Sequence, residues 1–161
     1  MDILKWLIMK VCIGGAFDQL HKGHKKLIEK AFEIAGKNGF VFIGLTKNKI
    51  DKRKKLIGTI EERQQKLEDL LSEKCFIDRS LIIPISDKYG PSVEGDFDAI
   101  VVSPETYETA KEINLKRVKF GKKPLKIIKI NFVFAEDGKP ISSTRILRGE
   151  IDKNGHILKD D

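Results

Sequence analysis

Cysteine is scarce in this chain of 161 residues, which contains only Cys12 and Cys75. Neither residue belongs to a C-x-x-C pair or to another spacing that would bind a metal, and Cys12 falls in an apolar run that is typical of a buried strand. The composition therefore argues against a disulfide-stabilised secreted fold. We expect both residues to be free thiols in a reducing compartment, which indicates a cytoplasmic protein.

Long apolar runs are also missing. The most apolar stretch, residues 1–8, is too short to span a bilayer and has no small-residue cleavage site, so we expect neither a membrane anchor nor a membrane partner. Internal repeats and linkers rich in Pro, Gly or Ser are absent as well. These absences predict an N-terminal extension over residues 1–8, followed by one domain over residues 9–161.

Acidic residues are outnumbered, with 24 Asp and Glu against 31 Lys and Arg, which gives a formal net charge of +7. Hydrophobic residues make up 40% of the chain and charged residues 34%, a balance that indicates a globular protein and not a disordered one. The excess of positive charge attracts polyanions such as nucleotides, nucleic acids and phosphorylated metabolites. It does not by itself choose among them.

Strand-like and helix-like segments alternate along the chain. Apolar runs predict five strands, at residues 10–14, 40–45, 81–85, 99–102 and 125–134. Apolar residues at helical spacing predict helices at residues 24–36, 61–74 and 104–120, and a short helix from about residue 143. This alternation predicts a single-domain α/β fold, a doubly wound (Rossmann-like) sheet of five parallel strands with helices on both faces. Ligands of such sheets bind at the carboxyl ends of the strands.

The loop after the first predicted strand has the composition of a phosphate-binding turn. Its glycines let the backbone approach a ligand closely, and the helix that follows offers free N–H groups and positive potential. Two of the three histidines, His21 and His24, lie three residues apart here. We predict that they bind a phosphate group, because no Asp, Glu or Cys at ligand spacing completes a zinc site, and we expect no metal site of protein residues. The predicted nucleotide-binding residues here are Gly14, Gly15, Ala16, Phe17, Asp18, His21, Gly23 and His24.

A second candidate segment lies near the C-terminus, at Ser142, Ser143, Thr144 and Arg145. Either serine is a natural N-cap for the short predicted helix. Three hydroxyls and the free amides of a helix start can hold the outer phosphates of a nucleotide, with Arg145 as a cation beside them. An ordinary capped helix would explain the serines, but a cation near a helix N-terminus opposes the dipole unless an anion lies between them.

Basic side chains crowd the loop between the second predicted strand and the next helix, at Lys47, Lys49, Lys52, Arg53, Lys54 and Lys55. Charge runs of this kind are usually solvated surface, yet one or two of these residues could clamp a transferring phosphate. A nucleic-acid patch is the other interpretation. No aromatic residue interleaves with the cations to stack on bases, so we expect no nucleic-acid partner.

Together the two motifs resemble the paired signatures of the HIGH-type nucleotidyltransferase superfamily. The middle of the chain narrows the resemblance to the archaeal and eukaryotic phosphopantetheine adenylyltransferases, to which residues 87–91, 98–106, 113–117 and 135–138 are similar. The resemblance extends from about residue 9 to the C-terminus. One departure lies at Ala16, where the family usually has a threonine that contacts the incoming phosphate.

The resemblance implies transfer of AMP from ATP to 4′-phosphopantetheine, which yields dephospho-coenzyme A and pyrophosphate in coenzyme A biosynthesis. Magnesium assists, and the attack is in line. His24 would bind the α-phosphate in the transition state with help from His21, and Ser142 to Arg145 would hold the β- and γ-phosphates; Arg145 thus joins the two histidines as a catalytic residue. The other implied phosphate contacts are Lys52, Lys54, Lys55, Lys116 and Arg117. The pair Glu62-Arg63 matches one that opens the family's next helix, and both a structural and a nucleotide-facing role are open.

Two other functions fit the end motifs. One is a sister nucleotidyltransferase that acts on nicotinamide mononucleotide, flavin mononucleotide or a phosphorylated alcohol, against which the segments 89–91 and 102–106 argue. The other is a non-catalytic module that binds nucleotides or RNA. Both histidines and the serine-rich helix start are intact, which argues against this second alternative.

Overall fold

The computed structural model describes residues 8–48 and 55–158. Most of the predicted N-terminal extension therefore lies outside the described residues, as do Lys49, Lys52, Arg53 and Lys54 of the basic loop. Within the described ranges, no helix is long and apolar enough to span a bilayer.

The predicted α/β fold is confirmed. Five strands form one parallel sheet in the order β3-β2-β1-β4-β5. The strands are β1 (Lys10–Gly15), β2 (Phe40–Thr46), β3 (Ser80–Ile85), β4 (Ala99–Val102) and β5 (Lys126–Lys129). The helices are α2 (Lys22–Ala35), α3 (Ile60–Glu73), α4 (Tyr107–Lys119) and α5 (Ser143–Leu147), with short 3-10 turns η1 (Ile77–Arg79) and η2 (Gly90–Ser92).

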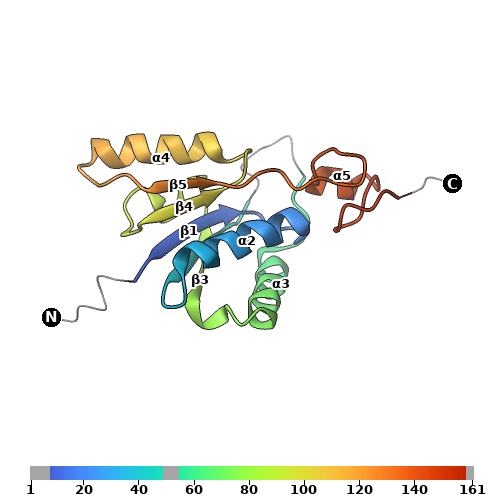
Figure 1. The fold of residues 1–161 in the computed structure, drawn as a ribbon, viewed down its shortest axis with the longest axis horizontal. Helices are drawn as coiled ribbons and strands as arrows, with labels where there is room; N and C mark the ends of the chain where they lie inside the picture. The colour runs from blue at the N-terminus through green and yellow to red at the C-terminus, as the bar shows by residue number, and fades with distance from the viewer. Residues whose placement is uncertain (1–7, 49–54, 159–161) are drawn as a thin grey trace.

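Helices cover both faces of the sheet, with α2 and α3 on one side and α4 on the other (Figure 1). The alternation of side chains along β1 explains this layering, because successive residues of a strand point to opposite faces. Val11 and Ile13 pack in the core beneath α2 and α3, whereas Cys12 packs in the core beneath α4. The central strands are buried on both faces, as parallel strands in such folds are.

The strand order reverses between β1 and β4, where the chain leaves the sheet toward α2 on one face and toward α4 on the other. In doubly wound sheets this divergence leaves a crevice at the carboxyl ends of the two strands. The first histidine motif follows β1 directly, so the fold places it at the edge of this crevice.

Most predicted boundaries agree with the structure to within one or two residues, and two differ by more. The fifth strand ends at Lys129 and not at residue 134, because β4 ends at Val102 and offers no further partner after the bond from the Ile130 amide to the Val102 carbonyl (2.9 Å). The helix expected from residue 104 begins at Tyr107, after a turn in which the Thr106 amide bonds to the carbonyl of Ser103 (3.1 Å).

Beyond β5 the chain forms a small unit around α5. Ala135, Ile141 and Ile151 make a separate apolar cluster there. The unit lies beyond the carboxyl ends of the strands, next to the first turn of α2 (Figure 1). A backbone hydrogen bond from the amide of Lys22 to the carbonyl of Lys153 (2.9 Å) attaches it to α2. The fold thereby brings the segment that follows β5 next to the start of α2.

Candidate active site

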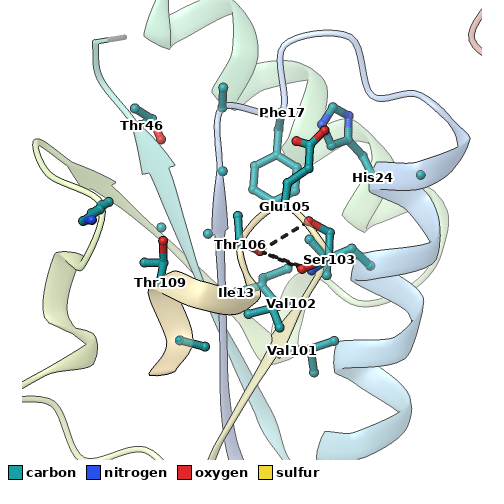
Figure 2. A pocket seen from close by; sticks show the side chains of 18 of the residues that line it. Ile13, Phe17, His24, Thr46, Val101, Val102, Ser103, Glu105, Thr106 and Thr109 are labelled. Atoms are coloured by element: carbon teal, nitrogen blue, oxygen red, sulfur yellow. Dashed lines mark hydrogen bonds between the residues drawn. The ribbon is translucent and has the colours of Figure 1, made fainter. Parts of the chain in front are cut away.

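A pocket of about 490 Å³ lies at the carboxyl ends of β1, β2 and β4. Its lining includes residues 14–18 with His21, Gly23 and His24 from the first motif, and residues 141–144 from the second. Figure 2 shows part of this lining, with Phe17 and His24 at one end and Thr46 at the end of β2. The two motifs that the sequence separates by more than a hundred residues thus share one cavity.

His21 and His24 form a reciprocal cap at the start of α2. The Nδ1 atom of His21 accepts hydrogen bonds from the amides of Gly23 (3.0 Å) and His24 (3.3 Å). In return, the Nδ1 atom of His24 accepts one from the amide of His21 (3.3 Å). The rings stack with their centroids 3.7 Å apart. Because each Nδ1 accepts, the proton of each neutral ring sits on Nε2, and both side chains retain an Nε2–H donor.

Burial keeps both imidazoles neutral. It lowers the pKa of His21 to about 4, although the charges of Asp18 and Glu105 act in the opposite direction. Burial, with a smaller contribution from His21, lowers the pKa of His24 to about 3. At neutral pH the pair is therefore a set of hydrogen-bond donors without net charge. Such donors can bind phosphate oxygens without first losing or gaining a proton.

We expect the free energy of unfolding to fall as the pH is lowered from about 6.5 to about 4. In that window the unfolded chain binds protons on its histidines while the folded chain does not, so acid favours unfolding, and the stabilisation is complete only above the unfolded pKa. Thermal melts across this window measure the effect. His24→Asn, which removes one of the two buried histidines, should show a shallower slope. Equal slopes in wild type and His24→Asn would contradict the assignment of neutral, buried histidines.

The turn between β1 and α2 is strained. Phe17 and Leu20 have φ angles of +47° and +40°. Residues other than glycine rarely adopt this backbone conformation, which costs about 1 kcal/mol or more per residue. The Phe17 ring is 1% exposed, and its centroid lies 5.4 Å from that of His24. Burial of this ring therefore helps to hold the turn in its unusual shape beside the histidines.

A side-chain hydrogen bond joins the two motifs. The hydroxyl of Ser143 donates to the Asp18 carboxylate (2.9 Å), and Asp18 is 8% exposed. Ser142 acts as the N-cap of α5, with its hydroxyl accepting from the amide of Arg145 (3.2 Å). The start of α5 is thus fixed relative to the turn after β1, and its hydroxyls line the same pocket.

Arg145 does not line the pocket. Its Nη2 forms an ion pair with Asp137 and its Nε one with Glu150 (2.9 Å), while its Nη1 donates to the Pro140 carbonyl (3.0 Å). These carboxylates supply the anion that the helix-dipole argument assigned to a ligand. The structure therefore gives Arg145 a role in bracing the α5 unit, and its predicted contact with the outer phosphates stays a prediction.

Of the lysines and arginines predicted to contact phosphate, only some lie at the pocket in the part of the chain that the structure describes. Lys55 lines the pocket and is exposed, whereas Lys52 and Lys54 lie outside the described residues. Arg117 is not at the pocket: it is 4% exposed and donates to the carbonyls of Ser92, Gly95 and Lys123 (2.8 Å each), so its assignment as an anion contact is wrong. Lys116 lies over the ring of Tyr89, 5.0 Å from its centroid, and does not itself line the pocket.

Sequence reasoning left one wall of the pocket out of the site. Residues 103–106 and the first turns of α4 line it, and Figure 2 shows the Glu105 side chain directed to the same part of the pocket as Phe17 and His24. The signal was present, since these residues follow β4 directly at the switch point of the sheet. Asp18 and Glu105 are the acidic residues of the lining, and the described residues contain no cluster of three metal-ligating side chains.

Comparison with known proteins agrees with this geometry. The family model described as cytidylyltransferase-like matches residues 12–149. A phosphopantetheine adenylyltransferase of Methanosarcina acetivorans is 49% identical over 152 residues, which cover 94% of this chain and 97% of the relative. The phosphopantetheine adenylyltransferase of Archaeoglobus fulgidus is 42% identical over 151 residues, which cover 93% of this chain and 100% of the relative.

A solved structure supports the same grouping. A crystal structure of a protein with unknown function from Archaeoglobus fulgidus is 36% identical and superposes with a TM-score of 0.68, covering 76% of this chain and 89% of the other. The family match spans most of the chain, and the curated relatives match at nearly full length. This chain therefore belongs to the cytidylyltransferase-like family of nucleotidyltransferases and, within it, to the archaeal phosphopantetheine adenylyltransferases.

Proposed function

We propose that this chain transfers AMP from ATP to 4′-phosphopantetheine and forms dephospho-coenzyme A and pyrophosphate. The observation that carries the proposal is the pair of neutral, stacked histidines beside a strained turn, whose Nε2–H groups have no hydrogen-bond partner among the described residues. The hydrogen bond from Ser143 to Asp18 adds a second helix start to the same pocket. Two helix starts at one cavity suit the triphosphate of ATP. The names of the relatives support 4′-phosphopantetheine as the acceptor.

In the proposed reaction, a phosphate oxygen of the acceptor attacks the α-phosphorus of ATP. The new oxygen–phosphorus bond forms as the bond to the bridging oxygen of the β-phosphate breaks, and pyrophosphate leaves with that electron pair. In the transition state, negative charge develops on the α-phosphate oxygens. The Nε2–H groups of His21 and His24 donate hydrogen bonds to these oxygens. No side chain needs to form a covalent intermediate, so the residues act by positioning and by hydrogen bonding.

Magnesium fits this pocket as a companion of the triphosphate. Asp18 and Glu105 are the carboxylates that line the pocket in the part of the chain that the structure describes, and one oxygen of Asp18 already accepts from Ser143. Few protein ligands are thus available, and Mg²⁺ commonly binds through one or two carboxylates and substrate phosphates. When bound, the ion would neutralise charge that develops on the departing pyrophosphate.

The pocket has an apolar part that suits the uncharged arm of the acceptor. Phe42, Ile85 and Ile113 line it together with Tyr89, whose hydroxyl donates to Glu112 (2.8 Å). An apolar channel with a few polar groups can bury an extended chain of amides and methylenes, because it removes apolar surface from water.

We place the reaction in the cytoplasm, in keeping with the thiols of the chain. Cys12 and Cys75 are free, and burial raises the pKa of Cys12 to about 11, so this thiol stays protonated and unreactive.

The assay that tests the function supplies the protein with ATP, Mg²⁺ and one acceptor at a time. Dephospho-coenzyme A and pyrophosphate should form with 4′-phosphopantetheine and not with pantetheine, which lacks the attacking phosphate. Nicotinamide mononucleotide and flavin mononucleotide serve as the competing acceptors. A dinucleotide product from either of them, with none from 4′-phosphopantetheine, would overturn the acceptor assignment.

A further inference from the structure

Arg63 is a buried cation next to the proposed phosphate site. It occupies the fourth position of α3, is 1% exposed and is the largest fully buried side chain of the described residues. It does not line the pocket, so it does not touch a ligand there. Among the described residues no carboxylate forms a salt bridge with it, although the charges of Asp18 and Glu61 act on it from nearby. Burial of a guanidinium without an ion pair costs free energy, which calls for a compensating role.

All three nitrogen atoms of the guanidinium donate to backbone carbonyls. Nη1 donates to Thr46 (2.6 Å) and to Ala16 (3.1 Å). Nη2 donates to Lys47 (3.2 Å) and Nε to Gly58 (3.3 Å). One side chain thus joins the turn after β1, the end of β2 and the start of α3. These are segments that meet at the carboxyl edge of the sheet.

These bonds also fix the direction of the peptide groups. The C=O and N–H of a trans peptide point in opposite directions. Because the carbonyls of Ala16 and Lys47 point toward Arg63, the amides of Phe17 and Asn48 point away from it. Both residues line the pocket, and neither amide donates a hydrogen bond to another residue that the structure describes.

We propose that Arg63 is a positioning residue for ATP, which holds the strained turn at Phe17 and the end of β2 so that the amides of Phe17 and Asn48 face the phosphates. The inference rests on the proposed function. Phe17 has a φ angle of +47°, and a strained turn keeps its shape only where its surroundings determine it. The bond from Arg63 to the Ala16 carbonyl restrains the peptide that precedes this angle. A carbonyl turned toward the pocket would instead repel a phosphate.

The role is tested by Arg63→Lys and Arg63→Gln, with ATP affinity measured by calorimetry in the absence of any acceptor. Arg63→Lys keeps the charge and loses the forked geometry, so it should weaken ATP binding about tenfold, and Arg63→Gln should weaken it further. In turnover assays the KM for ATP should rise and the rate should fall, while the KM for 4′-phosphopantetheine changes little. A residue with a merely structural role would not produce this difference between the two substrates.

Arg79→Lys is the matched control. Arg79 also donates to backbone carbonyls, those of Gly36 and Gly39, but at the opposite edge of the sheet. Its variant should bind ATP like the wild type. Melting curves identify temperatures at which each variant is folded, and Arg63→Lys carries the test if Arg63→Gln does not fold. Wild-type ATP affinity in folded Arg63→Lys would overturn the inference, whereas failure of the wild type to bind ATP would overturn the proposed function itself.

Discussion

Replacing His24 with alanine is expected to lower kcat by about a hundredfold or more, because the variant loses one of the two Nε2–H donors available to the α-phosphate in the transition state. Steady-state kinetics with ATP and 4′-phosphopantetheine measure the loss. The substitution also removes the acceptor for the His21 amide, which should reduce stability by about 1 kcal/mol, as loss of a helix cap does.

His24→Asn separates these two effects. The Oδ1 atom of asparagine can take the place of Nδ1 and accept from the His21 amide, so the cap is kept while the Nε2–H donor is lost. We expect wild-type stability and a rate as low as that of His24→Ala. His156→Ala is the matched control, since His156 is an exposed residue paired with Asp152, outside the pocket. Near-normal turnover of His24→Asn would mean that the imidazole acts only as a cap.

Removing the carboxylate of Asp18 is expected to lower kcat/KM for ATP by about a hundredfold. Asp18→Ala leaves the Ser143 hydroxyl without its acceptor and frees the start of α5 from the turn after β1. Since the phosphates are proposed to lie between these two segments, a small displacement of one weakens every contact made by the other. Initial rates at varied ATP concentration measure the loss, and Asp78→Ala, at an exposed residue far from the pocket, should have no effect.

A double-mutant cycle measures the coupling between Asp18 and Ser143 in their effect on kcat/KM for ATP. Ser143→Ala should reduce kcat/KM for ATP less than Asp18→Ala, and the double variant should be no worse than Asp18→Ala alone, because one hydrogen bond is lost in each case. Asp18→Asn can still accept from Ser143, so its loss of kcat/KM for ATP should be smaller than that of Asp18→Ala. Strictly additive losses would show that the two residues act independently and that the bond between them does not organise the site.

Sequence periodicity was sufficient for the fold, because β1 to β4 are apolar runs with glycine or polar residues at or next to their ends. It failed at residues 130–134, where alternation continues beyond the last available partner strand. Alternation reports which side chains prefer burial and carries no information about whether a neighbouring strand is present. The length of β4, which ends at Val102, sets that limit.

The two histidines and the serine-rich helix start were predictable because their spacing and their place after strands are local features. Their protonation was not, since it depends on burial by residues distant in sequence. Arg145 shows a related difficulty. Its partners Asp137 and Glu150 lie within eight residues but outside α5, and the dipole of that helix alone predicts only that some anion is near.

The burial of Arg63 and Arg117 is indicated by their positions in the sequence, although charged residues are usually exposed. Arg63 precedes Leu67 and Leu70 at helical spacing, and Arg117 follows Ala110 and Ile113 in the same way, so each lies on the apolar side of its helix. An arginine on such a face must either reach solvent or find acceptors inside. Both donate to backbone carbonyls, and only the folded chain shows which carbonyls are near.

The contacts between the two motifs determine how much of the chain must be translated before the active site can form. During translation the chain emerges N-terminus first, and all five strands are complete at Lys129. Asp18 and Lys22 then still lack their partners Ser143 and Lys153, which are translated only after the last strand of the sheet. A nascent polypeptide can thus build its sheet on the ribosome without a working nucleotide site. Chains that stop before Ser143 and Lys153 lack these two contacts, so we expect them to be inactive.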